Sequence, residues 1–367
     1  MLFHFGATTH FHDWRLVRNA WAAVDFFFTL SGFVIASAYY EKLRHASEFV
    51  QYAIRRVGRL YPLHLCVLAV YVGIELVHLL YWHAPDAFTG NRSVEGLVQS
   101  LFLVQGFTAN HECWNYPAWS ISVELWVNLS FGAVVLAAGR RFPLAALVIA
   151  VAFVAAIWWE DLWLDMLTPE LAGALNDVAS SVLEFTLGVL AYQLYAAFRA
   201  RGLKPWAVLE PLAAAIGAYI VLHADTLPDL TLPAFCCGLI FLFAFEGGPL
   251  SSVLKTPRLV QLGTYSYSIY LTHSLYLYAF GLAVLAAAHA LGIPGYGHAH
   301  PDLLAAGGPW AMDAAAALCV ACTIGGSALT YRYIEEPGRR GFNRVAVAAG
   351  AVAGGRSYGR VQPAFPR

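Results

Sequence analysis

Long apolar runs, separated by short polar segments, account for most of the chain. A helix needs about 20 apolar residues to cross the roughly 30 Å of hydrocarbon in a bilayer, and runs close to that length recur along the sequence. The pattern predicts an all-α fold, a polytopic transmembrane helical bundle with nine complete spans. The expected spans are residues 22–40, 60–82, 117–138, 142–159, 178–198, 206–223, 230–246, 263–285 and 310–331.

The two ends of the chain depart from this pattern. Residues Met1–Phe5 look like the last turn and a half of a further membrane helix, and no basic region with an apolar core indicates a signal peptide. We expect a truncated first span, which would bring a full-length chain to ten spans. Residues 345–367, rich in Ala and Gly, predict a disordered tail after a membrane domain at 1–344. Residues 94–107, between two spans, could form a short interfacial or re-entrant helix.

Composition supports the membrane class, because 59% of the residues are hydrophobic and 12% are charged, against about 25% charged in soluble domains. Lys and Arg concentrate in the cytoplasmic loops of membrane proteins. When the nine spans alternate, 19 of the 22 Lys and Arg residues fall on one side, and only Arg15, Arg18 and Arg92 fall on the other. We expect a multi-pass protein of the cytoplasmic (inner) membrane, with a cytoplasmic C-terminus, a lipid bilayer around it and no nucleic-acid partner.

The six cysteines form no framework of their own. Five lie in the expected spans and only Cys113 faces outward, so no disulfide pattern follows. Cys319 and Cys322 have the spacing of a metal or redox pair, but an apolar helix without partner ligands favours small packing residues. We expect no metal.

Ionisable residues in or beside the apolar runs are the first candidates for a functional site. A charged side chain well inside a bilayer costs roughly 2.5–3.5 kcal/mol on insertion scales, so such residues are rare unless they are paired or used. The element Trp119-Ser-Ile-Ser-Val-Glu124 places a carboxylate and two hydroxyls at the mouth of a span. Ionisable residues in similar positions are Asp25, His64, Glu75, Glu184, His273 and Asp313.

Five short elements follow one another along nearly the whole chain. They are Asp25-Phe-Phe-Phe-Thr-Leu-Ser-Gly-Phe33, Arg55-Arg-Val-Gly-Arg-Leu-Tyr-Pro62, Trp119-Ser-Ile-Ser-Val-Glu124, Tyr265-Ser-Tyr-Ser-Ile-Tyr-Leu-Thr-His273 and Ile334-Glu-Glu-Pro337. Each is weak alone, but together, in this order, they resemble the integral-membrane acyltransferase 3 family. The resemblance implies an enzyme that moves acyl groups onto extracytoplasmic acceptors, commonly sugars of surface or secreted glycans.

The resemblance also implies substrates and a catalytic residue. Members carry a catalytic His in the first span with an Arg ten residues ahead of it. Leu2-Phe3-His4-Phe5 matches the His end, and the Arg would fall before Met1. We expect an O-acyltransferase that moves an acyl group, in the first place acetyl, from acyl-CoA as donor to a hydroxyl of a carbohydrate or glycolipid acceptor.

The chemistry of acyl transfer also selects residues directly. Transfer from a thioester to a hydroxyl needs a base for the hydroxyl proton, and a neutral imidazole suits this task, so we assign it to His4. Glu124 could orient and charge that imidazole, bind an acceptor hydroxyl, or be a structural tie between helices. Ser120 and Ser122 could cap the helix at 118–125 or leave their hydroxyls facing a polar cavity.

The remaining candidates would bind the substrates. Arg55, Arg56 and Arg59 stand ahead of a span at helical spacing, where they could bind the phosphates of coenzyme A or serve as an ordinary cytoplasmic anchor. Tyr270 and His273, one turn apart, could line the same cavity or form a hydrogen-bonded pair between helices.

Four further positions complete the expected set. Trp119 and Asp25 are assigned to acceptor binding, although Asp25 could instead pair with Arg18 at the outer boundary of the membrane. Glu335 and Glu336 are expected to form surface ion pairs at the end of a helix with Arg332, Arg339 and Arg340.

Two functions of other classes stay open. A secondary transporter or lipid-linked flippase would also need many spans and buried ionisable groups, and it predicts paired inverted repeats with broken helices, which we do not detect in the sequence. A non-catalytic scaffold of an envelope-polysaccharide complex would show no acyl transfer. Transfer of labelled acyl groups by the purified protein would separate the enzyme from both.

Overall fold

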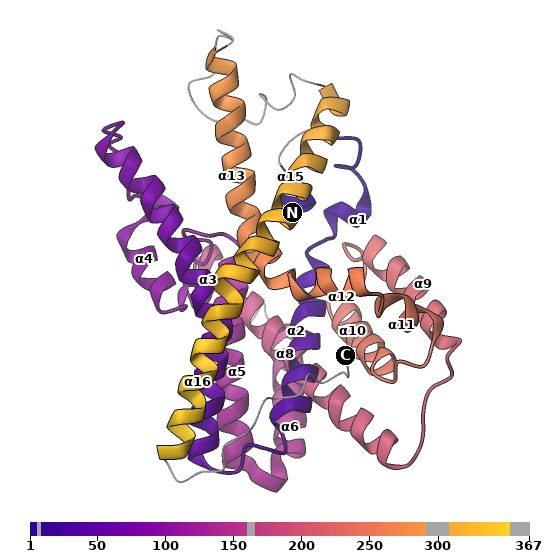
Figure 1. Cartoon of the computed structure of the whole chain (residues 1–367). Helices are drawn as coiled ribbons and strands as arrows, with labels where there is room; N and C mark the ends of the chain where they lie inside the picture. The colour runs from indigo at the N-terminus through magenta and orange to yellow at the C-terminus, as the bar shows by residue number, and fades with distance from the viewer. Residues whose placement is uncertain (6–8, 160–165, 291–307, 353–367) are drawn as a thin grey trace.

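The computed structural model describes residues 1–5, 9–159, 166–290 and 308–352. Every regular element in these residues is helical, as the sequence predicts. Within the bundle, α2 lies along α8 and α16 lies along α3, while α13 and α15 extend beyond the other helices at one end (Figure 1).

The elements are bounded as follows. The long helices are α2 (Ala22–Tyr39), α3 (Ala46–Leu80), α5 (Ala118–Ala138), α6 (Phe142–Trp158), α8 (Pro169–Ala200), α9 (Leu209–Leu222), α10 (Thr231–Phe243), α13 (Ser266–Ala290), α15 (Gly308–Thr330) and α16 (Glu336–Val352). The short ones are η1 (Leu2–His4), α1 (Arg15–Arg18), η2 (Gly90–Arg92), α4 (Val94–Leu101), η3 (Gln105–Phe107), η4 (Gly139–Arg141), α11 (Pro249–Leu254), α12 (Pro257–Thr264) and the π-helical turn η5 (Tyr331–Glu335).

Several helices have the length and apolar composition needed to cross a membrane, which makes the chain a helical membrane protein. Among the described residues, five segments meet both criteria: Ala22–Tyr39, Ala46–Leu80, Ala118–Trp158, Pro169–Ala200 and Gly308–Ala351. The third holds both α5 and α6, which the sequence predicts as two spans. By contrast, α9 and α10 have 14 and 13 residues, or about 20 Å at 1.5 Å per residue. The count of nine spans therefore stays a prediction.

Helix α3 begins well before the predicted span at 60–82. A capping box explains the early start, because the Glu48 carboxylate accepts hydrogen bonds from the backbone N–H groups of Arg44 and His45, at 2.5 and 3.0 Å. The helical spacing expected for the basic segment is present, and the helix begins ahead of that segment. The three arginines 55, 56 and 59 lie on the helix itself, where neighbouring helices fix their directions.

Glycines bring two pairs of helices into close contact. A Cβ at Gly32 of α2 would overlap the carbonyl of Phe185 in α8, and a Cβ at Gly188 would overlap the carbonyl of Thr29. Gly338 of α16 meets the ring of Pro62 in α3 in the same way. Small residues at such crossings allow close packing between membrane helices, so α2–α8 and α3–α16 are the rigid interfaces of the bundle.

The end of α16 corrects the predicted tail. The helix continues to Val352, whereas disorder was predicted from residue 345. One face of α16 packs against α3 as far as this end, where Gly350 lies directly against the side chain of Gln51. Residues 353–367 lie outside the described residues. The helix expected within 94–107 is confirmed as α4 and η3, and its position relative to the membrane stays a prediction.

Candidate functional site

Two imidazoles, from the first residues of the chain and from α13, meet face to face. The rings of His4 and His273 are stacked with centroids 5.4 Å apart and an angle of 18° between their planes. The Tyr116 ring lies edge-on to His4, with centroids 4.6 Å apart. The residue after His4 fixes this segment against α13, because Phe5 is buried and stacks on Phe280 of α13 with ring centroids 5.6 Å apart. The structure thus joins the predicted base to a second histidine.

The hydrogen bonding of His273 defines which of its nitrogens is available. Its Nδ1 lies 2.6 Å from the carbonyl oxygen of Tyr270. A carbonyl can only accept, so Nδ1 carries the hydrogen and Nε2 keeps its lone pair. The side chain is 3% exposed, and Nε2 has no hydrogen-bond partner among the described residues. His273 therefore offers a buried, unpaired acceptor beside His4.

Tyr270 links this histidine pair to α5. Its hydroxyl lies 2.8 Å from the hydroxyl of Ser120, which in turn donates to the carbonyl of Pro117 at 3.2 Å. Because Ser120 uses its only hydrogen on Pro117, Tyr270 is the donor to Ser120. The predicted capping role is wrong, since no side chain caps the start of α5. The predicted grouping of Tyr270, His273 and Ser120 is present.

Two other members of the same element point elsewhere. The Ser122 hydroxyl donates to the carbonyl of Leu103 at 2.6 Å and accepts from the backbone N–H of Gly106 at 3.2 Å, so it holds the loop after α4 against α5. Trp119 packs against the apolar cluster shared by α2, α5 and α8. Neither has a contact with the histidine pair among the interactions of the described residues.

Glu124 lies one turn along α5 from Ser120, on the same side of the helix. Its side chain is buried, and its carboxylate interacts electrostatically with Arg59 and Arg56 of α3 and with the Asn128 amide. A buried carboxylate in a membrane helix needs such partners. Glu124 therefore stands between the histidine pair on one side and the α3 arginines on the other.

The α3 arginines have different surroundings. Arg59 forms an ion pair with Glu335, and its guanidinium lies over the ring of Tyr267 at 4.9 Å from the centroid. Arg56 lies over the ring of Tyr39 at 5.6 Å, and Arg55 is buried. The three do not share one face toward solvent, as a plain anchor would. Arg56 and Arg59 both approach Glu124.

Asp25 belongs to a separate acidic group. It interacts electrostatically with Asp177 and Glu184 of α8, and the expected pairing with Arg18 is absent from the ion pairs of the described residues. Asp177 in turn acts on Tyr116. Burial, together with the charges of Glu112 and Asp177, raises the pKa of Tyr116, so its phenol keeps its proton and can donate a hydrogen bond.

Two residues of the site were not predicted from the sequence. Tyr116, in the loop before α5, has no local pattern that distinguishes it. Glu335 was expected at the surface, yet it is 1% exposed and pairs with Arg59. Its signal was the neighbouring Pro337, which lacks a backbone N–H and disturbs a helix at a defined place. Glu336 does form the expected surface pairs, with Arg339 and Arg340.

Comparison with known proteins shows the family of the chain. The family model described as an acyltransferase domain, that of the acyltransferase 3 family, matches residues 1–344. The chain is also similar to acyltransferase MdmB of Streptomyces mycarofaciens, with 27% identity over 347 aligned residues that cover 86% of this chain and 80% of the relative. No solved structure matches. The chain therefore belongs to the acyltransferase family that this domain defines, and it is an enzyme that transfers acyl groups.

Proposed function

We propose that this enzyme moves an acetyl or similar short acyl group from acyl-coenzyme A to a hydroxyl of an extracytoplasmic carbohydrate, free or carried on a lipid. One observation carries the proposal. The stacked His4 and His273 rings, the Tyr270–Ser120 hydroxyls and the Glu124–Arg59 charges follow one another through an otherwise apolar bundle. Placing polar groups from four distant segments together inside apolar surroundings costs free energy. A reaction centre that uses these groups explains why the fold bears that cost.

His4 is the base in this proposal. Its imidazole takes the proton of the acceptor hydroxyl while that oxygen attacks the thioester carbonyl. When the carbon–sulfur bond breaks, the imidazolium returns the proton to the departing thiolate, so the histidine ends neutral and coenzyme A leaves as the thiol. The stacked His273 keeps Nε2 free to accept a hydrogen bond from a second hydroxyl of the carbohydrate acceptor.

Donor binding falls to the arginines of α3. Guanidinium groups bind phosphate bidentately, and Arg59 and Arg56 lie near Glu124. A coenzyme A molecule held there would direct its thioester along α5 toward Ser120 and the histidine pair. Glu124 balances the arginine charges when the donor is absent and orients the polar groups between the two ends.

The acceptor would bind beside Tyr116. Its phenol can donate a hydrogen bond, and the carboxyl groups of Asp177, Glu184 and Asp25 lie beyond it. Carboxylates that accept from several hydroxyls are typical partners of sugars. Asp25 therefore keeps the acceptor-binding role that the sequence predicts, and Tyr116 lies between it and the reacting His4.

The proposed location is the cytoplasmic membrane, with the C-terminus in the cytoplasm. The excess of Lys and Arg on one side of the predicted spans supports this orientation. Reporter fusions after Arg141 and Arg201 should report the cytoplasm, and a fusion at Asp86 should report the outside. The reverse pattern at these sites would overturn the orientation.

The reaction is tested with purified protein, radiolabelled acetyl-coenzyme A and a panel of sugars. Wild type should transfer label to at least one hydroxyl acceptor. His4→Ala should lose about 10²- to 10⁴-fold in rate, the usual contribution of a general base, with a thermal midpoint close to wild type because His4 is only half-buried. No use of acetyl-coenzyme A by wild type would refute the donor, and full activity of His4→Ala would refute the base.

A further inference from the structure

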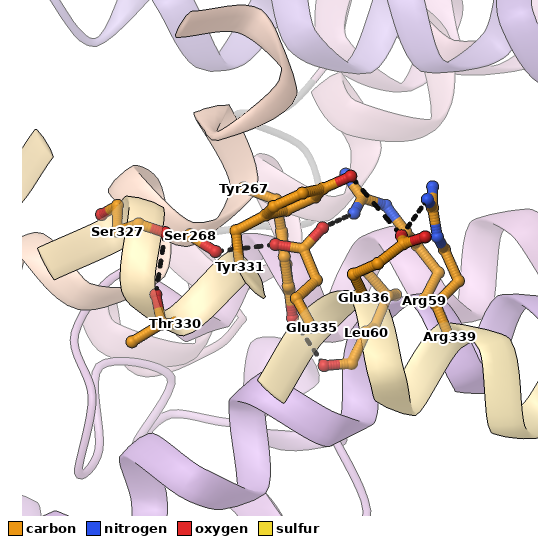
Figure 2. A network of polar contacts seen from close by, with 10 residues as sticks. All are labelled: Arg59, Leu60, Tyr267, Ser268, Ser327, Thr330, Tyr331, Glu335, Glu336 and Arg339. Carbon is orange, nitrogen blue, oxygen red and sulfur yellow. Dashed lines mark hydrogen bonds and ion pairs between the residues drawn. The ribbon is translucent and has the colours of Figure 1, made fainter. Parts of the chain in front are cut away.

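We infer that Glu335, on the π-helical turn between α15 and α16, is a positioning residue that holds the Arg59 guanidinium in the orientation needed to bind the donor. The inference rests on the proposed function, because it gives Arg59 a donor to bind. Figure 2 shows the network: Glu335 points inward to Arg59 and Ser268, while Glu336, the next residue, points to Arg339.

The turn itself sets the two glutamates apart. In η5 the backbone N–H of Glu336 bonds to the carbonyl of Tyr331, five residues back, so the helix carries one extra residue in this turn. Pro337 follows and lacks an N–H of its own, which ends the π turn at a fixed place. Such turns are frequent at functional sites. Here the turn directs Glu335 into the bundle.

Both oxygens of Glu335 are used. One accepts from Arg59, and the other accepts from the Ser268 hydroxyl of α13 at 2.7 Å (Figure 2). The carboxylate is buried, with 1% of its side chain exposed. A charge at that depth stays in place only with matched partners. Glu335 is therefore a fixed anchor, held by α13, to which the longer Arg59 side chain is attached.

Arg59 is held on a second side by an aromatic ring. Its guanidinium lies over Tyr267 at 4.9 Å, and the Tyr267 hydroxyl donates to the carbonyl of Leu60 at 2.6 Å. One guanidinium nitrogen is directed at Glu335, and one flat side of the guanidinium covers the Tyr267 ring. The remaining N–H groups of Arg59 have no hydrogen-bond partner among the described residues. Those groups are available, with a defined direction, for a phosphate.

A purely structural tie would predict a different layout. It would use every donor of Arg59 on protein groups and would leave its side chain buried. Instead, 28% of the Arg59 side chain is exposed while its partner is 1% exposed. The pair therefore has one fixed, buried member and one partly open member, which is the geometry of a group presented to a ligand.

The matched pair of adjacent glutamates makes the test specific. Glu335→Gln keeps the shape and the Ser268 contact but removes the charge that holds Arg59. The KM for acetyl-coenzyme A should rise by about tenfold or more, as expected for losing a hydrogen bond between charged groups, while the acceptor KM stays near that of wild type. Glu336→Gln breaks the surface pairs with Arg339 and Arg340, while its amide oxygen can still accept from the Tyr331 hydroxyl, so it should leave the donor KM unchanged.

A double variant tests whether Glu335 acts through Arg59 or has an effect of its own on donor binding. Arg59→Gln should raise the donor KM, and adding Glu335→Gln to it should change the donor KM by less than about twofold further, because the two residues act as one unit. Should Glu335→Gln fail to fold, Glu335→Asp keeps the charge on a shorter arm and should raise the donor KM by a smaller factor.

Three results would overturn the inference. These are an unchanged donor KM in a folded Glu335→Gln or Glu335→Asp protein, equal changes in donor and acceptor KM, and multiplying losses in the double variant. A wild-type protein that does not use acetyl-coenzyme A would refute the proposed function itself. The two failures are therefore distinguishable.

Discussion

The histidine pair and the Arg59–Glu335 pair are held in different ways. His4 and His273 meet where the first residues of the chain, a loop and α13 converge, and His4 is half-buried. Glu335 lies beside the tight α3–α16 interface, where Gly338 touches Pro62. The comparison teaches that the first region can lose the half-buried His4 side chain with little cost to folding, whereas changes in the second affect stability and function together.

After His4→Ala, the largest loss of transfer should come from His273, where two substitutions separate its two nitrogens. Asparagine places an amide N–H near the position of Nδ1, so His273→Asn can keep the bond to the Tyr270 carbonyl but lacks Nε2. We expect a loss of transfer rate of about 10- to 100-fold, toward the lower end of what proton-transfer groups contribute, with the thermal midpoint retained. His273→Gln should keep more activity and lose more stability. Equal activity in both variants would contradict a role for Nε2.

The second region should respond in stability first. A methyl group in Gly338→Ala would overlap Pro62 of α3, and overpacking costs about 1–3 kcal/mol. The thermal midpoint in detergent should fall and donor use should fall with it. The control is Gly341→Ala on the same helix, where a methyl meets nothing within 4 Å. If both variants melt alike, the α3–α16 interface is not the rigid frame described here.

The smallest effect on transfer should come from Ser122. Its hydroxyl holds Leu103 and Gly106 against α5 and does not contact the histidine pair. Ser122→Ala should cost about 2 kcal/mol, since two hydrogen bonds of about 1 kcal/mol each are lost, with transfer unchanged well below the melting temperature. Ser120→Ala should cost stability as well but should also lower transfer, since Ser120 carries the Tyr270 contact. Reduced transfer by a stable Ser122→Ala protein would move this residue into the site.

The helices could be predicted from the sequence because apolar runs are local and long. The apolar pattern of residues 117–138 appears directly as α5. The early start of α3 could not be predicted in this way, because a cap at Glu48 rather than hydrophobicity determines it. The continuation of α16 to Val352 depends on contact with α3, which no local pattern contains.

The site shows the same division. His4, Glu124 and Ser120 could be predicted because they sit in motifs or at unusual depths in apolar runs. The partners of Arg59 could not, because a pairing between residues 276 positions apart depends on how α3 crosses the α15–α16 helix. A surface position for Glu335 was expected because Arg332, Arg339 and Arg340 stand close to it in the sequence. The π turn, which the sequence pattern did not show, directs its side chain into the bundle instead.

Binding of coenzyme A tests most directly the claim that the histidine pair carries the reaction and the Arg59–Glu335 pair binds the donor. We would measure its Kd by equilibrium titration of wild type, His4→Ala and Arg59→Gln in lipid nanodiscs. The account predicts that His4→Ala binds within about twofold of wild type although its transfer rate falls by about 10²- to 10⁴-fold, and that Arg59→Gln binds about tenfold more weakly or worse. Weak binding by His4→Ala, or wild-type binding by Arg59→Gln, would contradict it.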